Sequence, residues 1–213
     1  MTAFLLMSLA ACGSNPQTEV KATETPAAEQ KESSEQTNTA EPEAAMKETE
    51  TAASAHSDVL VAYFSATGTT KGVAEKIASL TGGTLYEILA AEPYSSDDLN
   101  YNDSSSRSTK EQNDKNARPG IGSEDISLEG YTTVYLGFPI WWGEEPRILD
   151  TFVEKYSFEG ITVIPFCTSG GSGIGRSGSN MEALAGSGTW LEGKRFSGNV
   201  SEADLQSWID SMK

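Results

Sequence analysis

The feature that most constrains the fold is a buried-strand pattern followed at once by a helix pattern. Residues 59–64 form the continuous apolar run V-L-V-A-Y-F, which is typical of a strand buried on both faces. Residues 71–80 then carry apolar side chains at helical spacing, and Gly82 with Gly83 ends this pattern. Because such a strand needs helices on each side of its sheet, the sequence predicts an α/β domain.

The same alternation continues toward the end of the chain. The sequence predicts further strands at residues 84–89, 131–138 and 161–167, with a short fifth strand near 194–196. Helical patterns occupy residues 146–156, the region around 181–184, and the C-terminus from the N-cap Ser201 onward. This order predicts a mostly parallel sheet with helices on both faces. Residues 91–130 form a long polar connection that is expected to hold some helix, although the pattern does not fix its position.

The N-terminus has a different composition and predicts two further segments. Residues 4–11 form an apolar run that is too short for a membrane-spanning helix of about 20 residues. The run suits a signal peptide at residues 1–11. Leu9-Ala10-Ala11-Cys12 resembles the lipobox of bacterial lipoproteins, which implies cleavage before Cys12 and lipid attachment to its thiol. The alternative is a frayed helix that ends in a chance cysteine.

Residues 12–57 are predicted to be a disordered tether between the lipid and the domain. They consist mainly of Glu, Thr, Ala, Ser, Gln, Lys and Pro, and they contain no aromatic residue. Such a composition cannot bury enough apolar surface to offset the entropy of ordering the chain. A long charged helix is the alternative, and Pro26 and Pro42 argue against it. The folded domain is therefore expected at residues 58–213.

Charge and residue counts exclude several functions. The 31 acidic against 15 basic residues give a formal net charge of −16, which argues against nucleic acid as a partner. Nine Glu and three Lys leave −6 on the tether, so −10 belongs to residues 58–213. Two cysteines and one histidine cannot form a disulfide framework or a Cys/His zinc site, and no metal is expected. His56 lies in a polar stretch, which makes a catalytic triad improbable.

The loop after the first strand predicts a phosphate site. Four of the six residues in Ser65-Ala66-Thr67-Gly68-Thr69-Thr70 carry hydroxyls, and Gly68 lets the backbone close around an anion. The loop also opens a helix, whose free N–H groups and dipole favour negative charge. An ordinary strand-to-helix turn capped by threonine is the alternative.

These residues carry a resemblance to a known family. Tyr63-Phe64-Ser65-Ala66-Thr67-Gly68-Thr69-Thr70 resembles the phosphate loop of the flavodoxin family, whose pattern is roughly [ST]-x-T-G-x-T after the first strand. The resemblance implies an α/β/α fold with a five-stranded parallel sheet in the order 2-1-3-4-5. It also implies FMN bound at the carboxyl ends of the strands. The cofactor-binding residues that it implies in this loop are Ser65, Ala66, Thr67, Gly68, Thr69 and Thr70.

Two further loops complete the predicted site. The second follows the third strand and contributes Pro139, Ile140, Trp141, Trp142 and Gly143. Large flat indole rings suit stacking on a flavin ring. One of the two indoles is expected to pack in the core, and the alternative is that both do.

The third predicted loop follows the fourth strand. It contributes Thr168, Ser169, Gly170, Gly171 and Gly173, small residues that let the backbone approach the flavin edge. A flexible loop without such a role is the alternative. Gly173, Gly175 and Gly178 also match a dinucleotide fingerprint, but this match follows the wrong strand.

We expect an FMN-binding electron-transfer protein of the cell envelope, exported, lipid-anchored to the bacterial membrane and with its domain outside the cytoplasm. Its partner would be a redox protein with a basic surface or a small-molecule electron acceptor. The alternative is an FMN-dependent NAD(P)H:quinone or nitro reductase, and a third possibility is a partner-binding module without flavin. No catalytic side chain stands out, and Cys167 is expected to be buried filler. Glu144 and Glu145 would disfavour an anionic reduced flavin and so predict a low-potential couple.

Overall fold

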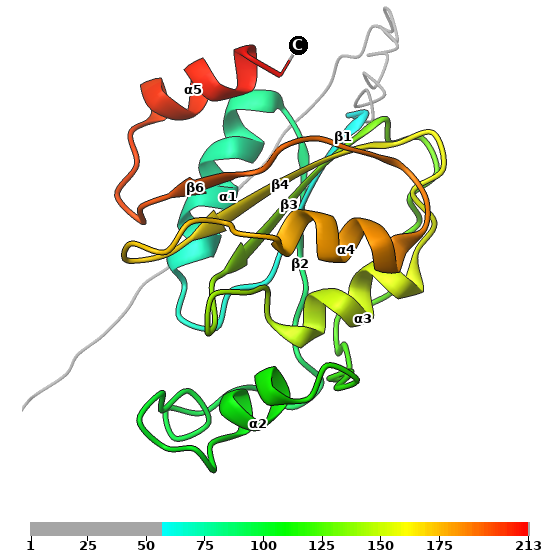
Figure 1. Ribbon diagram of the computed structural model, residues 1–213. Helices are drawn as coiled ribbons and strands as arrows, with labels where there is room; N and C mark the ends of the chain where they lie inside the picture. The colour runs from blue at the N-terminus through cyan, green and yellow to red at the C-terminus, as the bar shows by residue number, and fades with distance from the viewer. Residues whose placement is uncertain (1–56, 213) are drawn as a thin grey trace, which may run out of the picture. The chain divides into compact units, whose positions relative to one another are not determined.

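A parallel sheet with five strand positions forms the centre of the domain (Figure 1). The computed structural model describes residues 57–212. The strands are β1 (Val59–Tyr63), β2 (Thr84–Glu87), β3 (Thr133–Pro139), β4 (Thr162–Thr168), β5 (Thr189–Trp190) and β6 (Lys194–Phe196). Their order is β2-β1-β3-β4-β5, and β6 also pairs with β4. The predicted fold class and strand order are therefore confirmed.

The fifth position is divided between two short strands, where the sequence predicted one. β5 pairs in parallel with the start of β4, and β6, at the predicted residues, pairs with its end. The interruption coincides with Pro165. The backbone groups of Val163 face this edge of the sheet, since the Val163 carbonyl accepts a hydrogen bond from the N–H of Leu191. Pro165, two residues further along β4, faces the same edge. Because proline has no N–H, the ladder cannot continue through Pro165.

Helices cover both faces of the sheet (Figure 1). The five helices are α1 (Thr69–Thr81), α2 (Arg107–Asn113), α3 (Arg147–Lys155), α4 (Ser177–Ala185) and α5 (Glu202–Asp210). α1 and α5 bury Ile77 and Trp208 in one core cluster with Val61 and Phe166 of the sheet. α3 and α4 bury apolar side chains, including Phe152, in the cluster on the opposite face. The helix-on-both-faces arrangement follows from strands that are apolar on both sides.

Local signals in the sequence mark several element ends correctly. Gly82 adopts a left-handed conformation at the end of α1. Ser201 caps α5 by accepting a hydrogen bond from the N–H of Asp204 at 3.1 Å. α4 begins four residues before the predicted stretch, because its first turn is made of Ser, Gly and Asn, which give no apolar periodicity.

The connection between β2 and β3 folds at the carboxyl end of the sheet (Figure 1). Its two ends run together, since the N–H of Ala91 donates to Gly120 and the N–H of Gly122 donates to Leu89, both at 2.8 Å. α2 lies within this connection, and the Ser106 side chain caps it.

The predicted signal peptide at residues 1–11, Cys12, and the tether up to residue 56 lie outside the described residues. Within residues 57–212, no helix combines the length and apolar character needed to cross a membrane.

Candidate functional site

The three predicted loops meet at the carboxyl edge of the sheet, because they follow the neighbouring strands β1, β3 and β4. The hydroxyls of Thr70 and Thr168 lie 2.8 Å apart and are buried, which joins the first loop to the third. The N–H of Ile140 donates to the carbonyl of Thr168 at 3.1 Å, which joins the second loop to the third. The structure therefore brings together three predicted segments, of which the first and the third are joined by residues 98 positions apart in the chain.

The first loop exposes an open helix N-terminus. Gly68 occupies the N-cap of α1 with φ of 84°, and no side chain caps the helix there. The first backbone bond of α1 runs from Gly72 to Gly68 at 3.1 Å, so the N–H groups before Gly72 have no helical acceptor. Thr67 and Thr69 are exposed beside them, with hydroxyls 3.4 Å apart. The first turn contains no acidic residue that would repel an anion.

Ser65 and Thr70 differ in what they offer a ligand. The Ser65 hydroxyl is buried and has no hydrogen-bond partner within the described part of the chain. A buried hydroxyl of this kind is costly unless something satisfies it, as a phosphate or ribityl oxygen could. The Thr70 hydroxyl is buried and already hydrogen-bonded to that of Thr168, so it is less available to a ligand than the Ser65 hydroxyl.

The second loop is a tight turn with a tryptophan at its tip. Trp141 and Glu144 exchange backbone hydrogen bonds of 2.9 and 3.0 Å around Trp142 and Gly143, which have φ of 49° and 85°. Positive φ at both central residues is the type I′ pattern. Trp142 is the only residue other than glycine with positive φ in residues 57–212, a conformation that costs about 1–2 kcal/mol. The turn thereby presents an exposed indole at the tip of the second loop.

The two tryptophans have separate roles, as the sequence predicted for one of them. Trp141 is 2% exposed and packs edge-on against Phe64 and Tyr94, at ring separations of 5.6 and 5.1 Å. Trp142 is 42% exposed and touches Tyr101, with ring centroids 4.6 Å apart. Only the Trp142 ring is therefore available to stack on a ligand, while Trp141 anchors the turn.

The third loop is exposed along residues 170–173 and is fixed at its start. Arg195 of β6 donates from Nη2 to the carbonyl of Ser169 at 2.7 Å and from Nε to its hydroxyl at 3.2 Å. The Ser169 hydroxyl in turn donates to the carbonyl of Ser172. Cys167, just before the loop, is fully buried, and burial raises the pKa of its thiol to about 12. Cys167 is thus the apolar filler that the sequence predicted.

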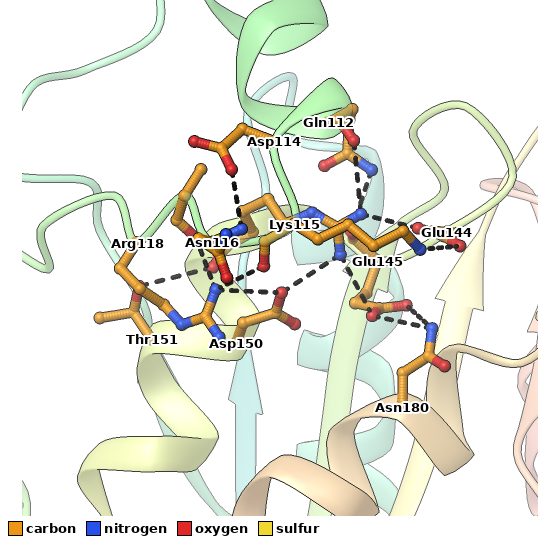
Figure 2. Close-up of polar contacts among 12 residues, drawn as sticks. Gln112, Asp114, Lys115, Asn116, Arg118, Glu144, Glu145, Asp150, Thr151 and Asn180 are labelled. Atoms are coloured by element: carbon orange, nitrogen blue, oxygen red, sulfur yellow. Dashed lines mark hydrogen bonds and ion pairs between the residues drawn. The ribbon is translucent and has the colours of Figure 1, made fainter.

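A buried charge cluster lies behind the second loop (Figure 2). Arg147 is 3% exposed and lies 2.7 Å from a carboxylate oxygen of Glu144, 3.7 Å from one of Glu145 and 3.2 Å from one of Asp150. Its proximity lowers the pKa of Glu144. Burial, followed by the nearby Glu145, raises the pKa of Asp150 to about 6. Arg147 offsets part of the negative charge of Glu144 and Glu145, so their electrostatic field is weaker than the sequence suggested. The low reduction potential of a bound flavin stays a prediction.

The sequence model of the flavodoxin family matches residues 58–212, which is nearly the whole described domain. The chain belongs to the flavodoxin family. The predicted family is therefore confirmed on residues that include all three loops of the site. No curated protein matches the chain with a significant score.

Solved structures extend the match to the fold. A candidate flavoprotein from Bacteroides eggerthii is 45% identical over 72% of this chain and 96% of its own, with a TM-score of 0.68. A similar candidate flavoprotein from Bacteroides uniformis is 43% identical over 71% of this chain and 97% of its own, also with a TM-score of 0.68. A Lactobacillus acidophilus flavoprotein in complex with FMN shares 22% identity over 71% of this chain and 97% of its own, with a TM-score of 0.55, and supports the fold.

Three residues that contact the loops of the candidate site carry no signal in the sequence. Tyr101 and Gln112 come from the connection between β2 and β3, where no periodic pattern marked α2. Arg195 comes from β6, a three-residue strand that carries no motif. Their contribution depends on tertiary contacts with loops far away in the sequence, so no local signal could have identified them.

Proposed function

We propose that this flavodoxin domain binds FMN and transfers electrons at the bacterial cell envelope. The observation that carries the proposal is the meeting of three loops around the open N-terminus of α1 (Figure 1). The family match and the FMN complex of the Lactobacillus acidophilus flavoprotein support FMN as the cofactor. When bound, FMN supplies a ring that takes up and releases one or two electrons.

The residues present fit the two ends of FMN. The phosphate would be held by the free N–H groups of the first turn of α1 and by the hydroxyls of Thr67 and Thr69. The unpaired Ser65 hydroxyl adds a further polar contact. The ring would be bordered by Trp142 on the second loop and by backbone N–H groups of residues 169–173 on the third.

The charge of the domain supports a role as a carrier for basic partners. Residues 58–213 carry a formal charge of −10, which attracts a basic protein over about one Debye length, near 10 Å at moderate salt. Location at the envelope follows from the lipobox-like Leu9-Ala10-Ala11-Cys12 and from a charged segment long enough to separate the domain from a lipid at Cys12. A redox protein with a basic surface is the partner we propose.

Electron transfer to a basic cytochrome c tests the carrier role. Reduced, FMN-loaded full chain should transfer electrons to the cytochrome at a rate that falls about tenfold when salt rises from about 10 to about 200 mM. A rate that is independent of salt would contradict docking through the acidic surface.

Steady-state oxidation of NADH and NADPH, with a quinone or nitroaromatic acceptor, separates the carrier from the reductase. The carrier predicts turnover well below about 1 per second, the lower end for ordinary enzymes. Faster turnover that depends on FMN would replace this proposal with the reductase function.

A further inference from the structure

Trp142 is held in its position by more than its own turn. Its backbone is left-handed, and its ring projects from the tip of the second loop. A two-residue turn closed by Trp141 and Glu144 does not by itself fix where an exposed indole points. The contacts that reach the turn from outside are therefore the ones that decide where the ring lies.

Gln112 of α2 bridges the two ends of this turn. Its Nε2 donates to the carbonyl of Trp141 at 3.1 Å and to the carbonyl of Glu145 at 3.2 Å. Both N–H groups of one amide nitrogen are thus used on the two residues that flank Trp142, Gly143 and Glu144. The Gln112 side chain is buried, and its backbone carbonyl accepts from Nη2 of Arg147 at 3.4 Å.

The amide oxygen of Gln112 indicates that this side chain serves as a hydrogen-bond donor. Oε1 of Gln112 is buried and has no hydrogen-bond partner in residues 57–212. Leaving an acceptor unpaired is unfavourable, so packing alone would be served better by an apolar residue of similar size. A glutamate would place a carboxylate against two carbonyl oxygens, and it could not donate when ionised.

Tyr101 supports the Trp142 ring itself. The two rings lie 4.6 Å apart at an angle of 43°, and both are exposed. Tyr101 comes from the same connection as Gln112, so one segment contacts both the backbone and the side chain of this turn. The connection thus gives this turn contacts that the other two strand-end loops do not supply.

We propose that Gln112 and Tyr101 are positioning residues that hold Trp142 for contact with the flavin ring, a role that rests on the proposed FMN binding. Neither residue needs to touch the cofactor. Gln112 fixes the backbone of the turn and Tyr101 fixes the orientation of the indole. Removing either should loosen Trp142 and leave the phosphate end of the site intact.

A double-mutant cycle between Gln112 and Trp142 tests this role. Gln112→Ala and Gln112→Glu should each weaken FMN binding about tenfold, while Asn113→Ala, an exposed amide on the same helix, should leave it within twofold. In the Trp142→Ala background, Gln112→Ala should add less than twofold. Equal losses in both backgrounds would overturn the proposal, because Gln112 would then act independently of Trp142.

The midpoint potential of the bound flavin distinguishes an effect on Trp142 from a general loss of protein stability. Gln112→Ala and Trp142→Ala should shift it in the same direction, and Asn113→Ala should not shift it. Urea midpoints measured on the same proteins identify any variant that is simply unfolded. Opposite shifts, or a shift in the control alone, would contradict a shared action on Trp142.

The apo-protein gives a result even if FMN binding itself fails. The difference in near-UV circular dichroism between wild type and Trp142→Phe isolates the Trp142 band. That band should fall by more than half in Gln112→Ala and Tyr101→Ala, but persist in Asn113→Ala and Tyr101→Phe, which keeps the ring. An unchanged Trp142 band in Gln112→Ala would overturn the positioning role. If the wild type does not bind FMN but the variants change the Trp142 band as described, only the proposed function is refuted.

Discussion

Gly137 shows at the scale of one residue why the middle of the sheet accepts so little change. A Cβ placed on Gly137 of β3 would lie 2.2–2.8 Å from three ring atoms of Phe166 on β4. The ring therefore packs directly on the backbone of the neighbouring strand. The sequence predicts a strand at residues 131–138, but the need for glycine at this position comes from a partner 29 residues away.

Gly137→Ala should lower the free energy of unfolding by about 2–3 kcal/mol, because Phe166 must leave its rotamer or the strands must part. Gly170→Ala is the matched control, since a Cβ there meets nothing within 4 Å. Urea unfolding of both variants measures the difference. A cost below about 0.5 kcal/mol at Gly137 would show that the ring moves freely.

Asp150 makes a second residue-scale prediction, on pH. Its pKa is raised from 3.8 to about 6 by burial and by Glu145, so the folded chain keeps this proton when the unfolded chain has released it. Its contribution to stability is present below pH 4 and is lost as the pH rises through 6. Relative to wild type, Asp150→Asn should gain about 2–3 kcal/mol between pH 4 and pH 7 in urea unfolding. A difference that stays constant with pH would contradict the raised pKa.

At the scale of elements, the sequence predicted those that local patterns specify. β1, the loop after it and α1 follow from an apolar run, a hydroxyl-rich segment and helical spacing. α2 and β5 could not be placed, because they are short and are held by contacts with distant residues, whereas β6 lies at the predicted residues. The three loops of the candidate site could be selected because each follows a predictable strand. Gln112 and Tyr101 reach the second of these loops from the connection that had no pattern.

The N-terminus of α1 makes the element-scale prediction. Thr67→Glu places a negative charge beside the free N–H groups of the first turn, where the phosphate would lie. FMN should bind at least about tenfold more weakly, whereas riboflavin, which has no phosphate, should change less than about twofold. Thr81→Glu, at the opposite end of the same helix, is the control. Equal losses for both flavins would place the phosphate elsewhere.

At the scale of the whole molecule, the charge of −16 is divided between a segment before residue 58 and a domain that carries −10. Cys12→Ser tests the proposed attachment. In cells, the wild-type chain should fractionate with the membrane and the variant should be released in soluble form. The purified variant should keep the flavin binding of wild type, because the site lies within residues 58–212. A variant that stays with the membrane would contradict anchoring through Cys12.

The central claim is that the three loops form an FMN site, and a titration of the purified full-length apo-protein with FMN tests it most directly. Flavin fluorescence should be quenched to an end point at one FMN per chain, with a dissociation constant in the micromolar range or tighter, at about −8 kcal/mol or below. The same sample should then show the visible absorption bands of oxidised flavin after gel filtration. A colourless protein that leaves FMN fluorescence unchanged would contradict the claim.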